Sequence, residues 1–173
     1  MYYFLLSQNL EILNRIKPTS ILKALDNNVL QLKQKGMDQL PIQVELKPQR
    51  NNVYVDFIAR PLPLISDPLK ELFEKYQADI FFKPVVLFDP QWEDQILYWI
   101  MIPESVGCLS QASQFNRNGA VEKIVIDSKR AAGANIFKIA ETVEPTIVVN
   151  LAVAESILRR DFIGIDLKKV EVD

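Results

Sequence analysis

The sequence predicts an α+β fold with a mixed, mainly antiparallel sheet and three or four short helices. About eight short runs have the composition and spacing of strands, and they do not alternate regularly with helical patterns, which disfavours a doubly wound parallel sheet. The length of 173 residues suits one domain. We expect a single domain over residues 1–173, with a variable N-terminal lobe (1–60) and an α+β core (61–173).

The first sixty residues carry several strand signals. Residues 2–6 are apolar and predict a strand. Apolar side chains alternate with polar ones over 42–47. Over 53–58, Val53, Val55 and Phe57 alternate with Tyr54, Asp56 and Ile58, and turn residues lie between the two runs, which predicts an antiparallel hairpin. Residues 60–64 contain two prolines, which push the preceding residues out of the helical region, so we expect an extended connection.

The segment between the first strand and this hairpin is mixed. Residues 12–25 include apolar side chains at helical spacing, but Pro18 interrupts any single helix. Thr19 or Ser20 can cap a short second helix. Gly36 follows a lysine-containing stretch and is typical of a helix end.

The clearest helix signal covers residues 65–76. Asp67 is the expected cap, and Pro68 suits the first helical position. Four side chains then fall on one face at helical spacing, which predicts a buried stripe: Leu69, Leu72, Phe73 and Tyr76.

The second half of the chain is read mainly as strands. They are expected over residues 81–87, 95–102, 121–127, 136–140 and 146–149, with further short runs at 163–167 and 170–172. Asn150 begins a helix that continues to about Arg160. Its inward residues are expected to be Leu151, Ala154, Ile157 and Leu158.

Composition limits the function classes. The net charge is −2, so no basic surface for nucleic acid is expected. No segment has the pattern of a signal peptide or a membrane-spanning helix. A single cysteine excludes an internal disulfide and fits a reducing compartment. The expected location is the cytoplasm, with no membrane partner.

The chain contains no histidine, which removes the commonest general base and metal ligand. We expect no cofactor and no metal, and no glycine-rich phosphate loop is present. Paired carboxylates are the catalytic option that needs no histidine. Glu93 and Asp94 with Glu104 are the candidates for a carboxylate-dependent hydrolase, and the alternative is that all three are solvated strand ends.

Two further nucleophile arrangements are weighed against structural roles. Cys108 has apolar neighbours and no activating base, so a small core residue is the better interpretation. Ser66 with Lys70, and Ser128 with Lys129, are formal serine–lysine pairs. Ser66 already has a structural role at a helix start, and residues 127–130 have the pattern of a charged turn after a strand, so neither pair is a specific signal. We therefore assign no catalytic residue.

Three aromatic residues lie on or beside one predicted strand: Trp92, Tyr98 and Trp99. Aromatic side chains are enriched at binding hot spots. The alternative is that alternating members fill the core.

Seven short motifs follow one another between residue 62 and about residue 167: Leu64–Leu72, Phe82–Val85, Leu97–Ile100, Leu109–Phe115, Ile136–Ile139, Val148–Ala154 and Phe162–Ile165. In this order they resemble a bacterial immunity protein family of polymorphic toxin systems, whose type member is myxobacterial. Gly107, Cys108 and Ser110 depart from the family, which often carries acidic residues there. The first sixty residues match little.

The resemblance implies a non-enzymatic inhibitor that acts in the cytoplasm by binding a cognate toxin. The mildly acidic pI of about 5.3 would suit a basic, nucleic-acid-degrading toxin. A carboxylate-dependent hydrolase and a structural or assembly module remain the alternatives at this point.

Overall fold

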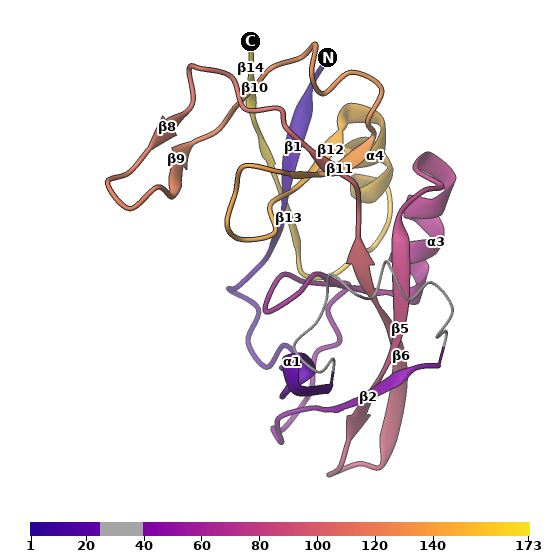
Figure 1. The fold of residues 1–173 in the computed structure, drawn as a ribbon. Helices are drawn as coiled ribbons and strands as arrows, with labels where there is room; N and C mark the ends of the chain where they lie inside the picture. The colour runs from indigo at the N-terminus through magenta and orange to yellow at the C-terminus, as the bar shows by residue number, and fades with distance from the viewer. Residues whose placement is uncertain (25–39) are drawn as a thin grey trace.

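The computed structural model describes residues 1–24 and 40–173, which form a mixed α+β fold built mostly of strands (Figure 1). Within these residues there are fourteen strands and three helices. Most strand pairs are antiparallel, and three are parallel. The predicted fold class is confirmed at this level, although the strands are shorter and more numerous than expected.

Two five-stranded sheets make up the body. The terminal sheet contains strands from both ends of the chain, in the order β13 (Ile165–Lys169), β1 (Tyr3–Gln8), β12 (Ile147–Asn150), β11 (Ile136–Ile139) and β7 (Ser105–Val106). The hairpin sheet has the order β2 (Ile42–Glu45), β5 (Phe81–Asp89), β6 (Asp94–Ile102), β4 (Leu64–Ser66) and β3 (Phe57–Ile58).

Two small sheets complete the strands. One pairs β8 (Gln114–Phe115) with β9 (Val121–Lys123), and the other pairs β10 (Val125–Ile126) with β14 (Glu171–Val172). No helix in the described ranges has the length and apolarity needed to cross a bilayer.

The longest pairing is the β5–β6 hairpin. Its register runs without interruption from Phe81 opposite Ile102 to Asp89 opposite Asp94. Both strands follow the sequence prediction closely. The turn that joins them projects at the bottom of Figure 1, at the opposite end of the molecule from the two chain termini.

The hairpin predicted from 42–47 and 53–58 is wrong. Strand β2 pairs in parallel with β5, and β3 pairs antiparallel with β4. Alternation predicts a strand with one buried face but does not identify its partner. Here the buried side chains of Val44, Val55 and Leu87 belong to one apolar cluster, and the nine-residue β5 offers β2 a complete ladder.

Three other expectations for the first half need correction. Residues 59–63 form the short connection between β3 and β4 and bend at 60–62, because the two strands pair directly. Of the extended run expected over 60–64, Leu64 alone lies in a strand, as the first residue of β4. Residues 12–16 form turns without a helix, and Ile16 is held by a hydrogen bond from its N–H to Val53 O. The predicted helix end at Gly36 lies outside the described residues. Helix α1 spans Ile21–Ala24.

The expected boundary between the lobes, near residue 60, falls between two paired strands of the hairpin sheet. Strand β1, from the expected N-terminal lobe, also lies in the terminal sheet between β12 and β13. Residues 1–60 are therefore shared between both sheets.

Helix α3 (Asp67–Tyr76) lies where the sequence predicts it, but its cap is Ser66 and not Asp67. The Ser66 hydroxyl accepts a hydrogen bond from the backbone N–H of Leu69. Ser66 has extended backbone angles, as a cap requires, whereas Asp67 is already helical. The predicted apolar stripe packs inward.

Helix α4 (Leu151–Leu158) begins after Asn150, whose side-chain oxygen accepts from the N–H of Val153. This confirms the predicted cap. Ala154 and Ile157 are buried as expected, but Leu151 and Leu158 are exposed. The helix is apolar on several sides, so spacing alone does not select the buried face.

Three apolar clusters hold these elements together. The central cluster combines residues of both sheets with those of α3 and α4, including Leu6, Ile65, Phe73 and Val153. The other two clusters each contain residues from one of the two sheets, and Tyr98 and Phe137 are among their members. Both sheets are therefore fixed relative to one another through the central cluster.

Gly164 provides a test of this packing. Its φ is +83°, and a Cβ at this position would lie 2.6 Å from the Cβ of Val55. Gly164→Ala is expected to lower the free energy of unfolding by about 3 kcal/mol, since strain and overpacking add. Gly119→Ala is the matched control, because Gly119 has φ +79° with open space around it. Its expected cost is about 1 kcal/mol. Equal losses in urea denaturation would contradict this account.

Candidate functional site

The end of the β5–β6 hairpin carries an unpaired strand edge. Strand β4 pairs with β6 only at Tyr98, Trp99 and Ile100. Within residues 1–24 and 40–173, no strand pairs with the outer side of β6 over Asp94–Leu97. On the other side of the hairpin, β2 pairs with β5 as far as Phe88. Among the described strands, the edge therefore lacks a partner on the β6 side alone.

The backbone at this edge is oriented for pairing. The N–H of Met101 donates to Pro63 O, on the β4 side of β6. Alternate residues of a strand present their backbone groups to the same side. The backbone N–H and C=O groups of Trp99, Leu97 and Gln95 therefore also point to the β4 side of β6. The N–H of Gln95 donates to its neighbour's carboxylate, at Asp94 Oδ1 (3.0 Å).

The side chains around this edge are apolar and acidic. Trp92 is 66% exposed, Leu97 39% and Ile96 36%. Glu93 and Asp94 lie between them and are also exposed. Residues 84–116 contain no lysine or arginine. We call residues 92–97 the exposed hairpin end.

The buried carboxylate of Asp89 stabilises the turn between β5 and β6. Asp89 is almost fully buried and accepts hydrogen bonds from the side-chain amide of Asn52 and from the N–H of Gln91. Tyr54 lies close by, and its phenol pKa is raised by burial and, to a smaller extent, by Asp94 and Asp89. These contacts give the exposed residues a rigid base.

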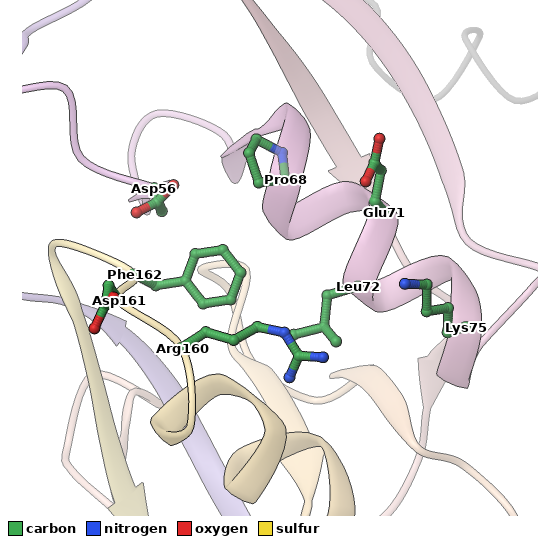
Figure 2. A pocket seen from close by; sticks show the side chains of 8 residues that line it. All are labelled: Asp56, Pro68, Glu71, Leu72, Lys75, Arg160, Asp161 and Phe162. Atoms are coloured by element: carbon green, nitrogen blue, oxygen red, sulfur yellow. The ribbon is translucent and has the colours of Figure 1, made fainter.

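A pocket of about 370 Å³ lies between α3 and the residues that connect α4 to β13 (Figure 2). Arg160 and Phe162 extend from that connection toward α3, where Leu72 lies opposite them. The lining combines acids, cations and apolar groups and contains no hydroxyl or thiol: Asp56, Pro68, Glu71, Leu72, Lys75, Arg160, Asp161 and Phe162.

Asp56 has a structural role in this pocket. Its Oδ1 accepts from the Ser66 hydroxyl at 2.5 Å, and its Oδ2 accepts from the N–H of Ile163 at 2.6 Å. The carboxylate therefore joins the start of α3 to the chain that enters β13. Each of its two oxygens therefore makes a structural contact.

The carboxylates suggested by the sequence do not converge. Glu93, Asp94 and Glu104 are all exposed, and none lines the pocket. Asp94 begins β6 and Glu104 follows its end, so about 27 Å of strand separates them. The convergence that the hydrolase hypothesis requires is absent from this set. In the described part of the chain, no three His, Cys, Asp or Glu side chains are grouped for a metal ion.

The two formal serine–lysine pairs have other roles. The Ser66 hydroxyl caps α3, while Lys70 Nζ lies 2.6 Å from Glu74 Oε1 and 4.5 Å from the Trp99 ring centroid. The Ser128 hydroxyl donates to the backbone oxygen of Asp173.

Cys108 is fully buried in the cluster that includes Tyr3 and Phe137, which confirms a core position. Burial, with a smaller contribution from Glu141, raises the pKa of its thiol to about 11.

Of the three aromatic residues Trp92, Tyr98 and Trp99, some fill the core and one is exposed as a binding hot spot would require. Tyr98 is buried, and its hydroxyl donates to Val55 O at 2.7 Å. Trp99 is half-buried and its Nε1 donates to Asp67 Oδ1. Trp92 alone is largely exposed and available for contact.

Sequence reasoning identified Trp92 but missed both the open edge and Asp56. The edge depends on where β4 stops relative to β6, which no local pattern reveals. The contacts of Asp56 join residues that are distant in the sequence. Comparison with known proteins adds no assignment: no protein-family model matches the chain, and no curated protein matches it either.

Asp56→Ala should destabilise the fold. The substitution leaves Ser66 Oγ and the Ile163 N–H without their acceptor, so a loss of about 2–4 kcal/mol in unfolding free energy is expected. Asp161→Ala is the control on the same pocket wall, because Asp161 is exposed. Its expected cost is below about 0.5 kcal/mol. Similar losses in the two variants would show that Asp56 is not a structural link.

The raised pKa of the Cys108 thiol predicts that the folded protein becomes less stable at alkaline pH. An ordinary thiol has a pKa of 9.0, and the folded-state value is about 11. As pH rises from 9 to 11, the unfolded chain loses this proton while the folded chain keeps it, so the free energy of unfolding falls. The fall is about 1.4 kcal/mol for each pKa unit of difference. Unfolding free energy is measured against pH for the wild type and for Cys108→Ala, and the difference between the two curves isolates the contribution of the thiol. Curves with the same pH dependence between pH 9 and 11 would refute it.

Proposed function

We propose that this protein is a non-enzymatic, cytoplasmic immunity protein that binds a bacterial toxin and blocks it. The observation that carries the proposal is the exposed hairpin end. Trp92, Ile96 and Leu97 present apolar surface beside the carboxylates of Glu93 and Asp94. A central aromatic anchor with a charged surround is typical of protein-binding hot spots.

The arrangement of the resembling motifs supports the proposal. Residues Leu64–Leu72 contribute β4 and the start of α3, Phe82–Val85 lies in β5, and Leu97–Ile100 lies in β6. These three segments are neighbours in the hairpin sheet. They therefore form one packed unit beside the exposed hairpin end.

The packing also suits inhibition by contact. Stable complexes of this kind bury about 1,600 Å² in total. A surface that is already ordered loses little conformational entropy on binding. Buried Asp89 and Tyr98 fix the backbone on both sides of the exposed residues, so the exposed hairpin end is presented in a defined shape.

The test is co-expression with the toxin domain encoded by the neighbouring gene. We expect a stoichiometric complex on gel filtration and restored growth of cells that produce the toxin. A toxin from an unrelated system, with equal expression, is the control and should remain toxic. A folded, active neighbouring toxin that neither binds nor loses activity at micromolar concentrations would refute the proposal.

A further inference from the structure

We infer that the outer edge of β6 at Asp94–Leu97 binds an extended, basic segment of the partner protein by strand addition. This inference rests on the proposed immunity function and specifies the surface that would carry it. The occupant is a protein segment, because the groups that the edge offers are backbone donors and acceptors.

The first step in the argument is the backbone. The alternation that points Met101 toward Pro63 also points Leu97 and Gln95 toward the open side. An added strand there would continue the place of β4, which leaves the sheet after Ser66. The Gln95 N–H now donates to Asp94 Oδ1, so that donor exchanges a local acceptor for the partner's carbonyl.

The second step is the pair of faces beside the edge. Ile96 lies opposite Leu87, on the face that also carries Tyr98, whereas Leu97 lies opposite Val86 on the other face. Both apolar side chains remain exposed. Alternate side chains of an added strand would therefore cover one apolar residue on each face.

The third step is the absence of protection on this edge. Natural edge strands usually carry lysine, proline or a bulge, which prevent unintended pairing. Residues 94–97 contain neither lysine nor proline, and the β5–β6 register has no shift. A regular edge with exposed Ile96 and Leu97 and no lysine or proline is suited to a partner strand.

Charge selects the kind of segment. Glu93 and Asp94 lie at the turn end of the edge, and Asp67 follows Ser66 at its other end. The cationic Lys47 follows β2, on the β5 side of the hairpin. Lys70 also lies at the Asp67 end, over the Trp99 ring, and is paired there with Glu74. A basic segment therefore meets opposite charge mainly at the turn end, from Glu93 and Asp94. Antiparallel pairing of two copies would instead bring the acids at the turn of one copy toward Asp67 of the other, which is unfavourable.

The principal test compares two apolar-to-lysine substitutions. Leu97→Lys places a cation on the edge without altering its backbone groups. Val143→Lys makes the same chemical change in the loop between β11 and β12, where Val143 is 93% exposed. Thermal melts should be similar for both variants. Affinity for the toxin, measured by calorimetry, should fall by about tenfold or more for Leu97→Lys and change by less than about twofold for Val143→Lys.

A second variant tests the charge. Asp94→Asn keeps a side-chain oxygen for the Gln95 N–H but removes the carboxylate charge. The association rate at low salt should fall several-fold, and its dependence on salt should weaken. Glu122→Gln is the matched control, since Glu122 is an exposed acid on β9. Its association rate should remain close to that of the wild type.

The outcomes separate the inference from the proposed function. Tight binding by the wild type and by folded Leu97→Lys would overturn the inference and leave the immunity function standing. Failure of the wild type to bind any toxin would refute both. A wild-type dimer that Leu97→Lys converts to a monomer would also overturn the inference, because a second copy would then occupy the edge.

Discussion

The double role of Ser66 determines the shape of the hairpin sheet. Ser66 ends β4, and its hydroxyl begins α3 by accepting from the N–H of Leu69 while donating to Asp56. The chain therefore leaves the sheet after three residues, although β6 continues for four more beyond that pairing. The turn into α3 at Ser66 thus coincides with the point where the outer side of β6 loses its partner, and this is the edge that the proposed binding uses.

The same region is rigid where it joins the body. The Tyr98 hydroxyl donates a hydrogen bond to Val55 O, and the indole N–H of Trp99 donates to Asp67 Oδ1. Asp89 closes the turn from the buried side. Order at the base lowers the entropic cost of binding a partner. Exposure at the end leaves the contact surface accessible. The pocket beside α3 differs, because the Asp56 carboxylate there is committed to structural contacts.

Much of the fold is predictable because its signals are local. Local signals include the helix starts at Asn150 and near residue 66, the alternation in β5 and β6, and the apolar stripe of α3. Each of these depends on residues that are close together in the sequence. The partner of β2 was not predictable, because alternation in 42–47 fits any neighbouring strand. The exposed hairpin end was only partly predictable. Trp92 is visible in the sequence, whereas the missing neighbour of Leu97 is a property of the whole sheet.

The most direct test of the account is amide hydrogen exchange of the protein, free and bound to the toxin. The account predicts that binding slows exchange most strongly at the outward-facing amides of Gln95 and Leu97, since these would become paired with the partner strand. Protection confined to the walls of the pocket between α3 and Phe162, with residues 92–97 unchanged, would contradict it.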